Sequence, residues 1–257
     1  MTIHNEEESN EEEIELNWEI AELDEWVENG RDPEICKYVI DLDIFNANLI
    51  KLPKEIFKLV NLISLDCSSN QLIKLPNEIG NLINLSYLNC EFCELVELPE
   101  EIGNLKNLDI FHCNDNYLRF LPKEIGNLKN LYEFECERNL LRELPKEIGN
   151  LKKLFNFNCG HNYLIKLPDE FCNLTNLCNF YCHDNYLKEL PKDFGNLIKL
   201  CVFLCVRNQL EYLPNSFGKL YNLEDFMCFD NNLVELPTGF SNLISLKMFN
   251  CDKKLKT

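Results

Sequence analysis

Prolines recur at a fixed interval along most of this 257-residue chain. Nine of the ten prolines form one column with a spacing of 23 residues. The column comprises Pro53, Pro76, Pro99, Pro122, Pro145, Pro168, Pro191, Pro214 and Pro237. A period of about 20 to 50 residues is typical of repeat architectures, in which each copy buries its apolar face against the next. The interval therefore predicts a stack of similar units.

Every copy follows one pattern, LPxEIGNLxNLxxFxCxxNxL. Residues 133–137 of one copy alternate polar and apolar side chains, which is the period of a strand with one buried face. Copies of this strand, stacked about 4.8 Å apart, form a parallel sheet whose inner faces share a core. A weaker stretch at residues 39–49 has the same spacing and precedes the first full copy, so we expect ten strands.

The other half of each copy, LPxEIGNLxNL, is too short for a long helix. We expect tight turns and short helical or 3-10 pieces there, each entered through its proline. The strands then line the concave side, because a shorter outer path would curve the stack the other way. An asparagine follows most strands, where its amide can bond turn backbone groups that no ladder reaches. This column comprises Asn70, Asn116, Asn139, Asn162, Asn185, Asn208 and Asn231.

The repeated LPxEIGNLxNL motif and the strand that follows it resemble the 23-residue class of leucine-rich-repeat proteins, which includes Ras-suppressor-like, Ras-pathway scaffold and plant intracellular Ras-group-related proteins. The resemblance covers residues 49–257. It implies an α/β fold, a right-handed horseshoe with a parallel concave sheet and short helical or 3-10 turns on the convex side. It also implies a non-catalytic binding platform, with a protein of a small-GTPase pathway as the partner.

The sequence departs from that family by placing Cys where Leu is usual and, in most copies, Phe at the preceding core position. A large residue beside a small one preserves the volume of a close-packed core, so we interpret the cysteines as small apolar groups. Their spacing of one strand lies within the Cα range of a disulfide, and a functional thiol ladder is the minor alternative. The column comprises Cys67, Cys90, Cys113, Cys136, Cys159, Cys182, Cys205, Cys228 and Cys251.

Acidic residues are concentrated at the start of the chain. Residues 1–43 hold 16 acidic and two basic side chains, so the remainder carries only −4 of the net charge of −18. No basic stripe that could neutralise phosphates is present, which argues against nucleic-acid binding. No apolar run approaches the roughly 18 to 20 residues that span a bilayer. The polar, acidic start is unlike a signal peptide, so we expect a cytoplasmic protein with reduced thiols.

We divide the chain into three parts. Residues 1–13 form an acidic disordered tail, residues 14–38 a helical N-terminal cap, and residues 39–257 the repeat domain, with nine full copies after the weak leading strand. The cap helix presents one apolar stripe to the core. The stripe comprises Leu16, Ile20, Leu23 and Val27.

Two features at the ends of the stack leave alternatives open. Trp18 and Ile14 lie off the helical stripe, so they pack on a loop or form a second contact surface. No comparable cap is predicted after Cys251, where lysines discourage edge pairing. The alternative is that this edge docks on another subunit.

No catalytic motif is present in the sequence. We find no GxxxxGK, GxGxxG, GxSxG or HExxH pattern. Cys90 and Cys93 form a lone CxxC without the second pair of a zinc site, and Cys93 falls in the asparagine column. His161, His183 and Asp184 can approach one another across strands, although solvated loop residues are the favoured interpretation. We therefore expect no enzyme, no cofactor and no metal.

Side chains at outward strand positions are not constrained by core packing, so they can differ from copy to copy. Residues 201–206 are apolar on both faces, so the alternation that leaves one face wet is broken there. With apolar residues on the adjacent strands, this stretch predicts a contiguous apolar patch on the concave side, of the kind that marks an interaction site. The predicted partner-binding residues are Tyr181, Val202, Leu204, Val206, Met227 and Phe229. Self-association into a homodimer through the same residues is the alternative.

A second outward feature is the row Glu133, Glu135 and Glu137, with like charges about 7 Å apart along one strand. We expect this acidic row either to steer a basic segment of the partner into the groove or to be a solvated face.

Overall fold

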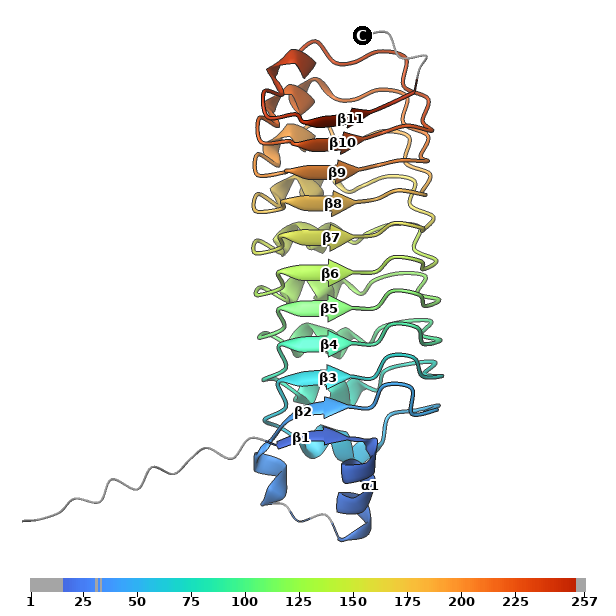
Figure 1. Cartoon of the computed structure of the whole chain (residues 1–257), viewed down its shortest axis with the longest axis vertical. Helices are drawn as coiled ribbons and strands as arrows, with labels where there is room; N and C mark the ends of the chain where they lie inside the picture. The colour runs from blue at the N-terminus through green and yellow to red at the C-terminus, as the bar shows by residue number, and fades with distance from the viewer. Residues whose placement is uncertain (1–15, 31, 33, 253–257) are drawn as a thin grey trace, which may run out of the picture.

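The computed structural model describes residues 16–30, 32 and 34–252. The predicted acidic tail and Ile14 lie outside these residues. The described chain forms one sheet of 11 parallel strands that follow one another in sequence order (Figure 1). The strands are β1 (Leu16–Glu19), β2 (Val39–Asp43), β3 (Ser64–Asp66), β4 (Tyr87–Asn89), β5 (Ile110–His112), β6 (Glu133–Glu135), β7 (Asn156–Asn158), β8 (Asn179–Tyr181), β9 (Val202–Leu204), β10 (Asp225–Met227) and β11 (Met248–Asn250).

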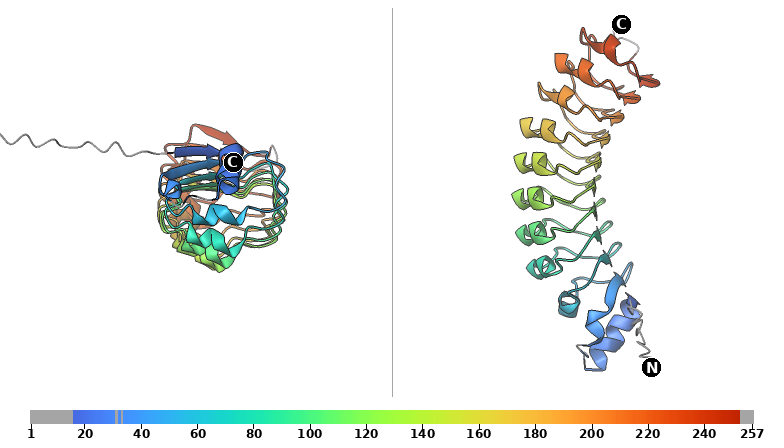
Figure 2. Two further views of the ribbon diagram at one scale, coloured as in Figure 1. Left: turned by 90° about the horizontal axis from the view of Figure 1, so that it is seen from below. Right: turned by 90° about the vertical axis from the view of Figure 1, so that its left-hand side faces the viewer.

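One α-helix, α1 (Ile20–Glu28), lies at the N-terminal end of the sheet, and 3-10 turns cover its outer side. Figure 2 shows the strands along one side of a gentle arc and the turns along the other, with the sheet on the concave side. The predicted solenoid is therefore confirmed. The turns are η1 (Ile35–Lys37), η2 (Lys54–Lys58), η3 (Asn77–Asn81), η4 (Glu100–Asn104), η5 (Lys123–Asn127), η6 (Lys146–Asn150), η7 (Asp169–Asn173), η8 (Phe194–Asn196), η9 (Asn215–Lys219) and η10 (Phe240–Asn242).

The 23-residue period sets the strand register. Phe134 of β6 pairs directly with Phe157 of β7, and each core residue from β2 to β11 meets its counterpart in the next copy. The phenylalanine rings of β5 to β9 consequently stack, with neighbouring ring centroids between 5.4 and 5.8 Å apart. Stacked rings and the cysteines beside them fill the interior continuously, as a close-packed core requires.

Proline and glycine fix the outer turns. Seven turns, η2 to η7 and η9, begin directly after the column proline, whose φ lies between −57° and −74°. The glycine within a turn lets adjacent turns approach closely. A Cβ built on Gly149 would lie 2.1 Å from the backbone oxygen of Glu170 in the next copy. Only glycine therefore fits this position without a shift of the backbone.

The asparagine column closes the inner turns, as predicted. Asn139 is buried, and its Nδ2 donates to the carbonyl oxygens of Cys113 (2.9 Å), Cys136 (3.2 Å) and Glu137 (3.2 Å). Its Oδ1 accepts from the backbone N–H of Leu118 at 2.9 Å. Each asparagine thus satisfies backbone groups of its own copy and of the preceding one.

The N-terminal cap differs from the prediction in one element. Residues 16–19 form strand β1, which pairs with β2, so the helical interpretation of these residues was wrong and the sheet has one strand more than expected. The helical interpretation took no account of the neighbouring sheet edge, whose backbone N–H and C=O groups are available to pair with this segment. Trp18 is buried, and its ring centroid lies 5.7 Å from that of Trp26 in α1. Trp18 therefore packs inside the cap.

Candidate functional site: the concave face

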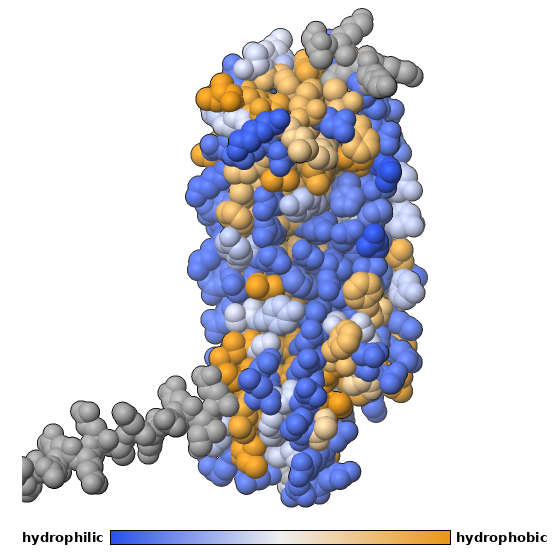
Figure 3. Space-filling view, viewed as in Figure 1, coloured by the Kyte–Doolittle hydropathy of each residue, from blue (hydrophilic) through white to orange (hydrophobic). Residues whose placement is uncertain are grey.

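The predicted partner-binding residues form a connected surface on the C-terminal strands. Leu204 on β9 pairs with Tyr181 on β8 and with Met227 on β10, so the three outward side chains stand side by side. Figure 3 shows an apolar region over the C-terminal strands, whereas the middle of the same face is mostly hydrophilic. We call the six predicted residues Tyr181, Val202, Leu204, Val206, Met227 and Phe229 the apolar patch.

Exposure differs among these residues. Leu204, Met227 and Phe229 are half-buried, whereas Val206 is only 9% exposed and offers little surface to a partner. Met248 on β11 is 48% exposed and pairs with Asp225 on β10, and the sequence-based set omitted it. Ile244, in the same last copy, is 84% exposed.

The acidic row is bonded to its neighbours. Glu133 Oε1 lies 2.7 Å from His112 Nε2, and Glu133 Oε2 accepts from Asn156 at 3.1 Å. Glu135 Oε2 accepts a hydrogen bond of 2.6 Å from Asn114. These carboxylates are therefore oriented by polar residues on the adjacent strands while they remain on the concave face.

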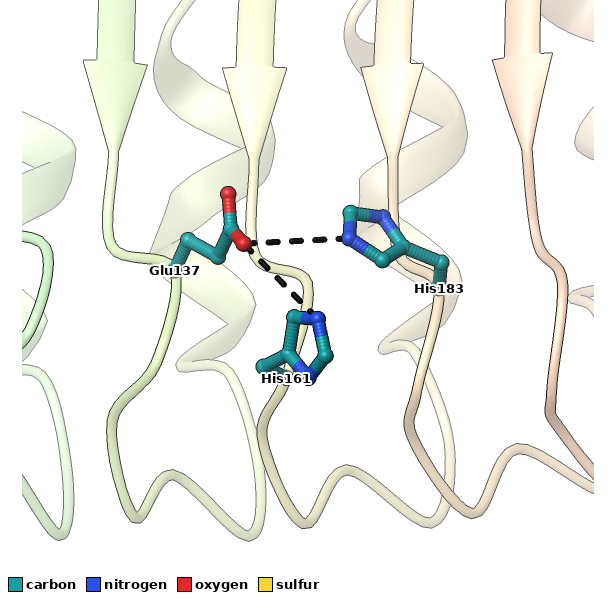
Figure 4. Close-up of side chains that lie close together, drawn as sticks. All are labelled: Glu137, His161 and His183. Atoms are coloured by element: carbon teal, nitrogen blue, oxygen red, sulfur yellow. Dashed lines mark ion pairs between the residues drawn. The ribbon is translucent and has the colours of Figure 1, made fainter.

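Glu137 of the acidic row forms a cluster with His161 and His183, which lie on the side of the apolar patch. The three residues follow β6, β7 and β8, respectively, and their side chains point toward one another (Figure 4). Nε2 of His161 is 3.9 Å and Nε2 of His183 is 3.8 Å from Glu137 Oε1. Both distances exceed those of an N–H···O hydrogen bond. The ligand atoms of all three lie within 4.8 Å of one another.

Gly160 makes the contact between Glu137 and His183 possible. Glu137, Gly160 and His183 occupy equivalent positions in three successive copies, so the two side chains start two strands apart. A Cβ built on Gly160 would lie 2.4 Å from Cε1 of the His183 ring. The imidazole thus occupies space that any other residue would fill, which lets it reach across β7 toward the glutamate.

The surroundings of this cluster are polar and partly buried. The His183 ring and the Asn158 amide, which donates to Glu137 at 2.7 Å, lower the pKa of Glu137 to about 2. The side chain of His161 is 37% exposed, and its Nε2 lies 3.5 Å from Asp184 Oδ2. The predicted approach of His161 and Asp184 is confirmed. The partner of His183 is Glu137, and nothing in the sequence analysis connected these two.

One atom of the cluster is unsatisfied. Nδ1 of His183 is buried and has no hydrogen-bond partner among the residues that the structure describes. A buried polar group without a partner costs on the order of 1–3 kcal/mol, so this nitrogen marks an incomplete set of interactions.

The cysteine column is a structural feature of the core. All of its members except Cys251 are buried, and several thiols donate to a carbonyl oxygen of the next strand, as Cys113 does to Glu135 at 3.2 Å. Burial raises the pKa of the Cys113 thiol well above its usual value. Thiols in this environment are inert, which agrees with their interpretation as small apolar groups.

Solved structures decide the family. A leucine-rich-repeat protein of Leptospira interrogans shares 31% sequence identity with this chain at a TM-score of 0.72, and the match covers 94% of this chain and 72% of that one. The chain belongs to the leucine-rich-repeat family. No protein-family model and no curated protein matches the sequence.

Two further leucine-rich-repeat structures are similar over most of the chain. The ectodomain of the plant membrane receptor kinase GASSHO1/SCHENGEN3 from Arabidopsis thaliana, in complex with CASPARIAN STRIP INTEGRITY FACTOR 2, has 30% identity and a TM-score of 0.77. The leucine-rich effector protein YopM from Yersinia pestis has 27% identity and a TM-score of 0.68. The matches cover 87% and 85% of this leucine-rich-repeat chain but only 28% and 56% of those proteins.

The described residues contain no helix of the length and apolar character that a membrane crossing requires.

Proposed function

We propose that this leucine-rich-repeat protein is a non-catalytic scaffold that binds a partner protein through the apolar patch on its concave face. The observation that carries the proposal is the in-register set of Tyr181, Leu204 and Met227 on three adjacent strands. Outward positions elsewhere on the sheet are mostly polar, so this concentration of apolar side chains has no role in the repeat core. The similar plant receptor was solved with a bound factor, which supports a protein partner.

A cytoplasmic signalling role completes the proposal. All 14 cysteines are free thiols, which agrees with a reducing compartment. The resemblance to Ras-group leucine-rich-repeat proteins makes small GTPases and their regulators the first partners to test. Fold similarity alone does not identify a partner, so the test must depend on the apolar patch.

The experiment compares three forms of the chain in quantitative affinity capture, followed by measurement of the affinity for the captured protein and for a panel of small GTPases. Leu204→Asp places a charge at the centre of the apolar patch and should abolish binding. Ile198→Asp is the matched control, because Ile198 belongs to the same copy, is 52% exposed and lies outside the concave strands. Unchanged affinity in Leu204→Asp would contradict the proposed site.

Self-association is the second candidate, and the C-terminal copy supplies the observation that favours it. Met248 is exposed on the outward face of β11, so the last described strand offers an apolar side chain at the end of the stack. Light scattering over a concentration series distinguishes the two candidates. A monomer in wild type and in Leu204→Asp supports binding of a different protein. A dimer that Leu204→Asp dissociates would assign the patch to a homodimer.

A further inference from the structure

We propose that Glu137, His161 and His183 form a binding site for one divalent transition-metal ion, and that Zn²⁺ is the ion that suits it. Two imidazoles and one carboxylate are ligands that Zn²⁺ accepts in proteins, and a site with three protein ligands keeps a fourth position for water. The site is separate from the apolar patch and does not depend on the proposed partner.

The distances fit an ion better than they fit direct contacts. In the protein alone, the two Nε2 atoms are 3.9 and 3.8 Å from Glu137 Oε1, which is too long for hydrogen bonds. Around a tetrahedral Zn²⁺, ligand atoms about 2.0–2.2 Å from the ion lie about 3.3–3.5 Å from one another. The ligand atoms lie within 4.8 Å of one another, so binding would require them to move closer together. The geometry is therefore that of groups around a shared centre.

The protein has already arranged the ligands. His183 reaches Glu137 only because Gly160 has no side chain between them. His161 is brought to the same place by the left-handed backbone of its turn, where its φ is 48°.

Charged side chains of both signs surround the cluster. Glu137 supplies a carboxylate, whose Oε2 accepts from Asn158 at 2.7 Å and whose Oε1 lies 3.6 Å from the Arg138 guanidinium. Asp184 lies 3.5 Å from His161 Nε2 and adds a second negative charge, although Arg207 balances part of it at 3.4 Å. Because Asp184 faces the same nitrogen that would bind the ion, it adds negative charge at the site and does not orient the imidazole through its other nitrogen.

A second group in the same sheet provides the contrast. His112, Glu133 and Glu135 also offer three ligand atoms within 4.8 Å of one another. Here His112 Nε2 is already 2.7 Å from Glu133 Oε1, which is hydrogen-bond distance. Metal binding at His112 Nε2 would have to break this hydrogen bond. This group is therefore satisfied by protein contacts and serves as an internal control.

The test is a Zn²⁺ titration of the full-length chain, prepared without a polyhistidine tag, stripped with a chelator and kept reduced. Isothermal titration calorimetry should show one Zn²⁺ per chain for wild type and for the control His112→Asn. His161→Asn, His183→Asn and Glu137→Gln should each weaken binding more than about 100-fold, since even loss of an outer-shell group costs about 10- to 100-fold.

Gly160→Ala tests the geometry without removing a ligand. The new Cβ would displace the His183 ring, so we expect weaker Zn²⁺ binding while circular dichroism shows an unchanged fold. Thermal unfolding gives a readout independent of calorimetry, because a bound ion raises the unfolding temperature of wild type and not of His183→Asn.

Three results would overturn the proposal. The first is no stoichiometric Zn²⁺ binding by wild type. The second is equal affinity in wild type and His183→Asn, or an equal loss in His112→Asn. The third comes from Co²⁺, used as a spectroscopic substitute for Zn²⁺. Thiolate-to-cobalt charge-transfer bands in its absorption spectrum would show that the ion binds to cysteines. Visible bands of four-coordinate Co²⁺ without thiolate bands, lost in His161→Asn, support the proposed ligands.

Discussion

Asn139 Nδ2 donates a hydrogen bond of 2.9 Å to the carbonyl oxygen of Cys113, which lies 26 residues earlier in the chain. The same amide bonds two carbonyl oxygens of its own copy, and its oxygen accepts from a backbone N–H of the preceding copy. One buried side chain thus joins two repeats. Stability in a repeat stack depends on such nearest-neighbour contacts, so the asparagine column should be a main contributor.

Asn139→Ala should lower the free energy of unfolding by about 2–3 kcal/mol, because it leaves the buried N–H of Leu118 without a partner and one unpaired buried group costs about 1–3 kcal/mol. Urea unfolding followed by circular dichroism measures the change. Asn130→Ala is the control, since Asn130 is only partly buried and its bonds, to the carbonyl oxygen of Lys106 and from Lys153, are exposed. Equal losses in the two variants would show that burial of the amide is unimportant.

Cys93 occupies the asparagine column and tests the same idea in the other direction. Its Sγ donates to the carbonyl oxygen of Cys67 at 3.4 Å, where an asparagine amide would donate more strongly and also accept from a backbone N–H. Cys93→Asn should therefore stabilise the protein by about 1 kcal/mol, the typical net value of a hydrogen bond. A shift of the urea midpoint to lower concentration would show that this copy has adapted to the smaller side chain.

Sequence reasoning was successful wherever a residue acts through its column. The strand register, the proline-initiated turns and the asparagine hydrogen bonds all follow from the 23-residue period, because each residue packs beside the residue 23 positions away in the next copy. It failed at β1, where a helical stripe of apolar residues lies beside a sheet edge that offers backbone partners. Local periodicity cannot detect such a tertiary neighbour.

The cluster around Glu137 shows a different limit. The sequence places Glu137 in the acidic row of its own copy and predicts only an approach of the two histidines to Asp184. The missed signal was Gly160, the one residue without a side chain in the outward column between Glu137 and His183. The absence of a side chain at Gly160 matters only because the His183 imidazole extends across β7. That extension depends on side-chain positions, which the repeat pattern does not reveal.

Cys178 should show a pH dependence that the buried cysteines lack. Partial burial, together with the neighbouring thiol of Cys201, raises the pKa of Cys178 to about 11. The thiolate is the reactive form, so the alkylation rate should increase about tenfold per pH unit up to about pH 11 instead of levelling off near the usual value of about 8.5. Mass spectrometry after timed iodoacetamide exposure measures the rate at each cysteine.

Cys201→Ser is the informative variant for this measurement. It removes the neighbouring thiol, so the midpoint for Cys178 should move to lower pH while the buried Cys113 stays unreactive in both proteins. A midpoint near the usual value in the wild type would contradict the raised pKa.

The acidic row supplies the last prediction, which concerns the rate of partner association. Glu133→Gln with Glu135→Gln removes two charges and keeps the oxygens that accept hydrogen bonds from His112 and Asn114. If the row steers a basic segment of the partner, the association rate constant at low salt should fall at least about threefold, with little change in the dissociation rate. Stopped-flow mixing with the captured partner gives both constants.

Salt and position provide the controls. The association rates of wild type and variant should converge near 1 M salt, where the Debye length is only about 3 Å. Glu100→Gln with Glu101→Gln removes the same charge from η4 on the convex side, so it should leave the rate almost unchanged. A rate that is insensitive to salt in the wild type would make the row a solvated face, because the carboxylates would then contribute no long-range attraction to the association step.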